Sequence, residues 1–117
     1  MIPTDWMPHH RRADGELVGY LVLDGDGFVP RTLVGYPLAE ALEVDEAEEL
    51  LDERGLTVLA DRWVMDGGPR EAMLVRIVEV RADVVRVVDD DTGAAAVVGA
   101  NLETYELPAP TDALRPA

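Results

Sequence analysis

Residues 73–88 have the sequence MLVRIVEVRADVVRVV. Met73–Val80 and Val84–Val88 are rich in β-branched residues, which favour strands, and the three residues between them favour a turn. Both segments are apolar on both faces. This is typical of strands in the middle of a sheet, covered on each side by other elements or by a second subunit. The stretch therefore predicts a central antiparallel hairpin.

The charged residues of this hairpin predict its register. With Arg81–Val84 as the closing pair, Glu79 lies opposite Arg86 and Arg76 lies opposite Asp89. Each of these pairs joins opposite charges, and such cross-strand pairs stabilise a sheet.

Strand patterns also occur on both sides of this hairpin. Glu16–Leu23 and Phe28–Val34 predict a second hairpin, because the turn-forming stretch Asp24–Gly27 joins them. Ala94–Ala100 and Thr104–Leu107 are weaker strand candidates.

One helix is predicted between the two hairpins. Asp45 is expected to cap its N-terminus together with Glu48, and Gly55 is expected to end it in the left-handed conformation. Residues 56–66 are compatible with a helix or a strand. We favour a strand over Leu59–Met65, because the glycine interrupts the helix and β-branched residues follow it.

Together these elements predict a β-rich α+β fold, with a bent antiparallel sheet or small barrel of about six or seven short strands and one inserted helix. The chain of 117 residues suits a single core. We expect one globular domain over residues 16–107, an irregular N-terminal arm over residues 1–15 and a disordered tail over residues 108–117. Trp63 is predicted to be a core residue. Trp6 is predicted to tuck over an open end of the sheet, with a partner-facing anchor as the alternative.

The amino-acid inventory restricts the chemistry that the chain can perform. It contains no Ser, Cys, Lys or Gln, and its single Asn is Asn101. Without Ser or Cys the common nucleophiles are missing, and without Lys neither a Schiff base nor the phosphate-binding Gly-x-x-x-x-Gly-Lys loop can form. We therefore expect no catalytic residues and no cofactor, and we favour a protein that is not an enzyme.

The charge of the chain argues against nucleic-acid binding. The formal net charge is −14, whereas binding to a phosphate backbone requires clustered Lys and Arg. Residues 36–66 are the most acidic part of the chain. Such a surface can attract a basic partner, or it can serve solubility alone.

Three sequence features contain side chains of the kind that bind metal ions. Asp24–Gly27 resembles the start of a calcium loop, but the residues that follow supply no closing carboxylate. Asp89–Asp91 could hold a divalent cation with Glu79 or Glu103, although consecutive residues of an extended chain cannot all face one ion. His9-His10 could bind a transition metal from a mobile terminus or, together with Arg11-Arg12, reach across to acidic residues on the same or another chain. We predict no metal site at any of them.

We predict a small acidic binding or structural module that acts through protein contacts, including self-association as a homodimer. One alternative is a carboxylate- or metal-assisted hydrolase that uses Asp89–Asp91. The other is an acidic nucleic-acid mimic, built on Glu40–Glu53, that binds a basic protein. No secretory signal and no apolar run of membrane-spanning length are visible, so the expected compartment is the cytoplasm, without membrane contact.

Overall fold

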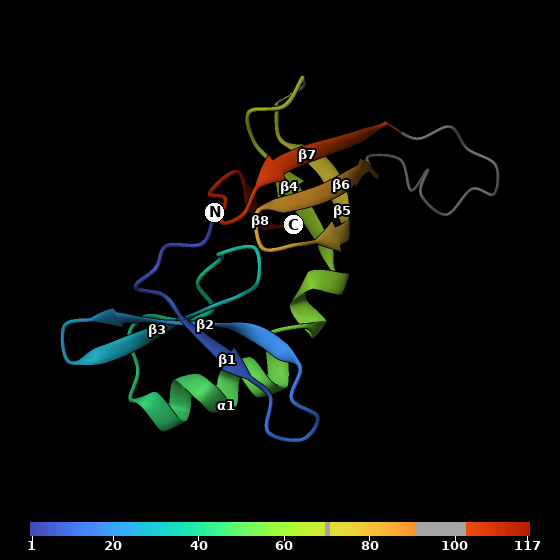
Figure 1. The fold of residues 1–117 in the computed structure, drawn as a ribbon. Helices are drawn as coiled ribbons and strands as arrows, with labels where there is room; N and C mark the ends of the chain where they lie inside the picture. The colour runs from blue at the N-terminus through green and yellow to red at the C-terminus, as the bar shows by residue number, and fades with distance from the viewer. Residues whose placement is uncertain (70, 91–102) are drawn as a thin grey trace.

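The computed structural model describes residues 1–69, 71–90 and 103–117 (Figure 1). Within these ranges the chain forms eight β-strands, one α-helix and one short 3-10 helix. The predicted β-rich α+β class with one α-helix is confirmed. The strands are divided between two antiparallel sheets, of three and five strands, instead of being joined in one. The predicted strand over Ala94–Ala100 lies outside the described residues.

The smaller sheet, here the N-terminal sheet, has the strand order β1-β2-β3. Its strands are β1 (Met7–His10), β2 (Leu17–Asp24) and β3 (Gly27–Arg31). Asp24 pairs with Gly27, and Gly25 between them has φ of 62°, as tight hairpin turns require. The predicted turn at Asp24–Gly27 is confirmed.

The prediction of an irregular arm over residues 1–15 is wrong at β1. Met7–His10 pairs with β2, and Pro8 lies opposite Tyr20. Proline is tolerated here because β1 is an edge strand, where a missing N–H need not break a ladder. Trp6 packs against the sheet as predicted: its ring centroid lies 5.9 Å from that of Tyr20, and the Arg31 guanidinium lies 5.1 Å from its ring.

The larger sheet, here the C-terminal sheet, has the order β7-β6-β5-β4-β8. Its strands are β4 (Arg62–Met65), β5 (Met73–Val80), β6 (Val84–Asp89), β7 (Thr104–Pro108) and β8 (Leu114–Pro116). The β5–β6 hairpin therefore lies inside the sheet, as predicted. The prediction of a disordered tail over residues 108–117 is wrong, because Leu114 is buried and pairs with Met65 at the sheet edge.

One of the two cross-strand pairs predicted for the β5–β6 hairpin is present. Glu79 pairs with Arg86, but Arg76 pairs with Val88 instead of Asp89. The register shifts between Ile77 and Glu79, so one extra residue sits in β5 as a β-bulge. The bulge reverses the alternation of faces. It lets Ile77 pack against the core while Glu79 points outward to meet its arginine.

Two elements occupy the segment of the predicted strand over Leu59–Met65. The 3-10 helix η1 covers Thr57–Ala60, and β4 begins only at Arg62. The strand prediction therefore holds for its second half and is wrong for Leu59-Ala60. The indole of Trp63 donates a hydrogen bond to the Val58 carbonyl at 3.2 Å, which ties the short helix to the strand.

The helix α1 covers Val44–Arg54 and begins before the predicted cap. Its capping residue is Glu43, and no side chain caps the first turn. Gly55 has φ of −56°, so the predicted left-handed end is also wrong. Glycine is required there by close approach, because a Cβ atom would lie 2.3 Å from the Val18 carbonyl oxygen.

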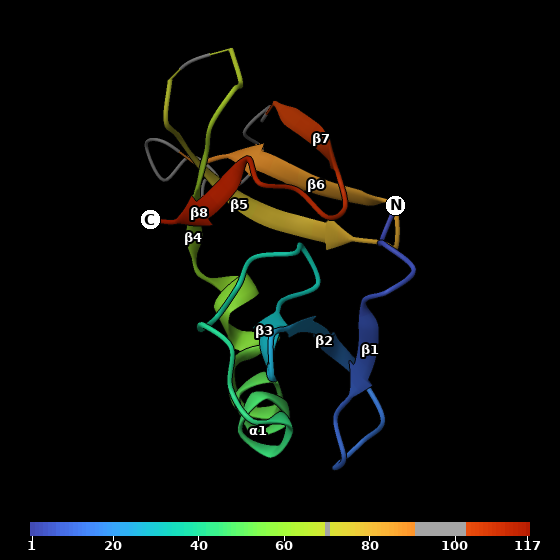
Figure 2. The same ribbon diagram turned by 90° about the vertical axis from the view of Figure 1, so that its left-hand side faces the viewer.

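The two sheets have separate cores. The larger core lies beneath the C-terminal sheet and includes Trp63, Met65, Met73, Val75, Val85 and Val87. The smaller one lies between the N-terminal sheet and α1, and consists of Val18, Leu21, Ala47 and Leu51. Figures 1 and 2 show α1 on the side of the N-terminal sheet that faces away from the C-terminal sheet. No helix in the described residues is long and apolar enough to span a membrane.

Candidate functional site

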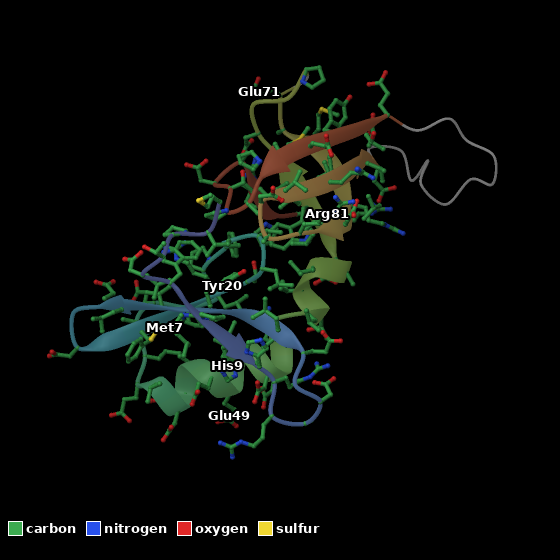
Figure 3. The ribbon with its side chains drawn as sticks, viewed as in Figure 1. Met7, His9, Tyr20, Glu49, Glu71 and Arg81 are labelled. Carbon is green, nitrogen blue, oxygen red and sulfur yellow. The ribbon has the colours of Figure 1, made fainter. Side chains whose placement is uncertain are left out.

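A cleft of about 670 Å³ separates β1 from α1. The strand side supplies three basic or titratable side chains and the helix side supplies four carboxylates. Figure 3 shows His9 and Glu49 on these two sides. The lining residues are His9, His10, Arg12, Asp45, Glu48, Glu49 and Asp52.

His9 joins the two sides of the cleft. Its Nε2 atom lies 2.8 Å from Oδ1 of Asp52, and its Nδ1 atom lies 3.5 Å from Oε2 of Glu48. These two acids are four residues apart and share one helix face. Ionised carboxylates only accept hydrogen bonds, so the His9 ring is the donor to Asp52, and Glu48 lies on the other side of the same ring. The edge strand is thereby held to the helix by one side chain.

The position of His9 follows from the packing of the helix. His9 lies opposite Gly19 on β2, and opposed residues point to the same face of a sheet. A Cβ atom on Gly19 would lie 2.7 Å from Cδ2 of Leu51. The missing side chain therefore brings α1 close to the sheet, and this places its acidic side within reach of His9.

The four other carboxylates of α1 have no ion-pair partner among the described residues. They are those of Asp45, Glu46, Glu49 and Glu53. The density of acids is visible in the sequence. The sequence does not indicate that Asp52 is the acid that His9 contacts, because 43 residues separate them and no local pattern connects a terminal strand to this helix.

The predicted cluster Asp89–Asp91 has a different environment. Asp90 is fully buried, with Arg62 Nε 3.1 Å and Arg76 Nη2 3.8 Å from its Oδ2 atom. Neither carboxylate oxygen has a hydrogen-bond partner of good geometry. Asp91 lies outside the described residues. Arg62 and Arg76 are opposed across β4 and β5, so Asp90 relieves the repulsion between two like charges.

Glu79 and Glu103, the two acids that could join this cluster, have other contacts. Glu79 is held by Arg81 at 2.7 Å and by Arg86 at 3.1 Å. The Glu103 carboxylate accepts a hydrogen bond of 2.6 Å from the Tyr105 hydroxyl. Glu79 and Glu103 therefore bind other side chains, while the contacts of Asp90 are with Arg62 and Arg76.

Comparisons with known proteins supply no homologue. The chain matched no family model, no curated protein and no solved structure. Within the described residues, no group of three or more His, Asp or Glu side chains is arranged to hold a metal ion. The β1–α1 cleft has a wall of carboxylates on α1. His9 contacts two of them, and the others are available to a cation from another molecule.

Proposed function

We propose that this protein is a non-enzymatic binding module that acts through protein contacts, and that the β1–α1 cleft with the acidic face of α1 is its contact surface. The supporting observation is an imbalance of charge. Residues 40–53 contain eight carboxylates and no Lys or Arg. Among the described residues, the imidazole of His9 is the side chain that contacts the acids of α1 from outside the helix.

An unbalanced surface of this kind suits a basic partner. Like charges held on one helix repel each other, and an approaching cation relieves that repulsion. Opposite charges also steer the partner during diffusional encounter, and this effect weakens as salt screens it. The proposal therefore predicts association that depends strongly on ionic strength.

The test compares two variants of equal net charge. The first neutralises four acids of α1 through Asp45→Asn, Glu46→Gln, Glu49→Gln and Glu53→Gln. The matched control neutralises four exposed acids elsewhere, through Asp61→Asn, Glu71→Gln, Asp83→Asn and Asp112→Asn.

Partners are captured by cross-linking at low and at high salt. We expect wild type and the control to retain the same partner at low salt, and the α1 variant to lose it. Equal retention by both variants would show that α1 is not the contact surface.

A second candidate function is a nucleic-acid mimic built on Glu40–Glu53, favoured by the same run of acids. It differs in the class of partner, which would be a protein that normally binds DNA or RNA. Competition by a short DNA duplex distinguishes the two functions: displacement of this protein from its partner supports the mimic, and persistence of the complex contradicts it.

Self-association as a homodimer is a separate proposal. Its motive was the apolar outer face of β5 and β6, but Val64 and Val88 on that side of the sheet are only 8% exposed in the single chain. A sheet edge is then the better contact surface, with β1 and β7 as candidates. Sedimentation velocity at high micromolar concentration should show a dimer, and a clean monomer would contradict this.

A further inference from the structure

Three large apolar side chains of the N-terminal sheet and α1 are exposed, and two of them, Met7 and Val44, lie within two residues of the cleft-lining His9 and Asp45. Met7 is 43% exposed, Leu23 is 63% exposed and Val44 is 42% exposed. Met7 lies opposite Leu21, which packs in the core beneath α1. Leu23 follows two residues later on β2, so it shares this face. Met7 and Leu23 therefore both lie on the helix side of the N-terminal sheet.

Val44 belongs to the same region through the helix. It precedes the buried Ala47 and Leu51 of α1 by three and seven residues, and so continues their apolar stripe. Figure 3 shows the Met7 side chain between the sheet and α1. We call Met7, Leu23 and Val44, which lie on the helix side of the sheet and on the apolar stripe of α1, the apolar mouth.

The acids beside the apolar mouth indicate what covers it. Asp45 follows Val44 directly and lines the cleft together with Glu49. Neither Asp45 nor Glu49 has an ion-pair partner among the described residues. A complementary occupant must combine apolar side chains with positive charge.

We propose that the apolar mouth binds a short basic segment of another protein, which inserts bulky apolar side chains between Met7, Leu23 and Val44 and places Lys or Arg against Asp45 and Glu49. The inference rests on the proposed function and names the class of its partner. A second copy of this chain fits poorly, because it has no Lys and carries a net charge of −14. An anionic lipid surface would be repelled for the same reason.

The first experiment titrates the isotope-labelled full chain with three synthetic peptides of equal length, observed by NMR. One alternates Leu and Arg, one alternates Ser and Arg, and one alternates Leu and Glu. We expect the Leu/Arg peptide to shift signals in β1, at the end of β2 and in the first turn of α1. The Ser/Arg peptide should bind roughly tenfold more weakly, since it loses apolar burial. The Leu/Glu peptide should not bind.

The second experiment uses matched variants of the protein. Met7→Thr with Leu23→Thr should weaken Leu/Arg binding roughly tenfold. Val78→Thr, at an exposed apolar residue of β5, should leave it unchanged.

Asp45→Asn with Glu49→Gln should weaken binding more than Glu46→Gln with Glu53→Gln. Each pair removes two charges, one of them from the first turn of α1, so the loss of helix-dipole stabilisation is matched.

The outcomes separate this inference from the function on which it rests. Equal binding of the Leu/Arg and Ser/Arg peptides, or shifts that map away from the mouth, would overturn the inference. The proposed function would survive if the four-acid variant of α1 still lost its captured partner. If the four-acid variant kept both its captured partner and the Leu/Arg peptide, the proposed function and this inference would both be wrong.

Discussion

The acidic face of α1 and the outer face of the C-terminal sheet both carry many charges, but they balance them differently. On the sheet, Arg86 contacts Glu79 at 3.1 Å and Glu106 at 3.3 Å, and Arg115 contacts Asp66 at 3.0 Å. On the helix, the His9 imidazole contacts two carboxylates, those of Glu48 and Asp52. The sheet satisfies its charges within the fold, whereas the helix leaves its charges open to an outside partner.

The difference arises from which residues meet in each element. Across a sheet the register brings side chains from different strands together, so acids and arginines can alternate. Along a helix the neighbours are three or four residues apart, and here they are mostly acids, such as Asp45 with Glu49 and Glu49 with Glu53. Each like-charge pair of this kind destabilises an isolated helix by roughly 0.2–0.5 kcal/mol. The packing of Leu51 against the sheet must offset this.

The largest expected effect tests whether the core of the C-terminal sheet contributes more to stability than the packing on the N-terminal sheet. Trp63 is fully buried and packs edge-on against Tyr36, with 5.4 Å between ring centroids. Trp63→Ala should lower the free energy of unfolding by about 3–5 kcal/mol. Trp6→Ala, at the partly exposed ring over the smaller sheet, should cost about 1 kcal/mol. Urea melts of both variants provide the measurement, and equal small losses would contradict the assignment of Trp63 to the core.

The next effect concerns the buried charge of the C-terminal sheet. Asp90→Ala should lower the free energy of unfolding by about 1–3 kcal/mol, because Arg62 and Arg76 would then oppose each other without a counter-ion. Asp66→Asn, which breaks the exposed contact with Arg115, should cost less than about 1 kcal/mol. Thermal melts compare the two variants. If Asp90→Ala left the melting temperature unchanged, the stability of the fold would not depend on the contacts of Asp90 with Arg62 and Arg76.

A smaller effect is expected at the bridge between β1 and α1. His9→Gln should lower the free energy of unfolding by about 0.5–1.5 kcal/mol, because Glu48 and Asp52 lose their shared partner. It should also speed amide hydrogen exchange in β1. The exposed neighbour offers a control, since His10→Gln should change stability by less than about 0.5 kcal/mol. Unchanged exchange in β1 would show that the bridge does not hold the strand.

The smallest effect is expected in the turn between β1 and β2. There Arg11 and Asp14 form an ion pair, as the opposite charges of the C-terminal sheet do. Hydrogen bonds from the Arg11 side chain, at 2.6 and 3.0 Å, together with the Glu16 amide, lower the Asp14 pKa to about 2. A lowered folded-state pKa stabilises the fold above the ordinary value, and this contribution is lost as pH falls through about 2.

Carboxyl NMR titration checks this directly. Arg11→Gln should return the pKa of Asp14 toward its ordinary value of 3.8. An unchanged titration midpoint in that variant would contradict the role of the arginine.

Local chemistry was enough to predict several parts of this protein. The β5–β6 hairpin, the turn at Asp24–Gly27, the presence of one helix after the first hairpin and the burial of Trp63 each depend on residues close together in the chain. The contact of Glu79 with Arg86 belongs to the same group, because only the turn at Arg81–Val84 separates their strands. The acidity of the candidate site was likewise evident from residues 40–53.

Other features were decided by contacts between distant segments. Pairing of Met7–His10 with β2 and of Leu114–Pro116 with β4 overrode the local effect of proline, because both are short edge strands. The bulge between Ile77 and Glu79 depends on which face the core requires. The contact of His9 with Asp52 and the burial of Asp90 beside two arginines arise from strand order and helix packing. Composition and local pattern therefore determined the class of the fold and the sign of its surface. Tertiary structure decided which charges are matched, because only the packed chain brings residues of different elements within bonding distance.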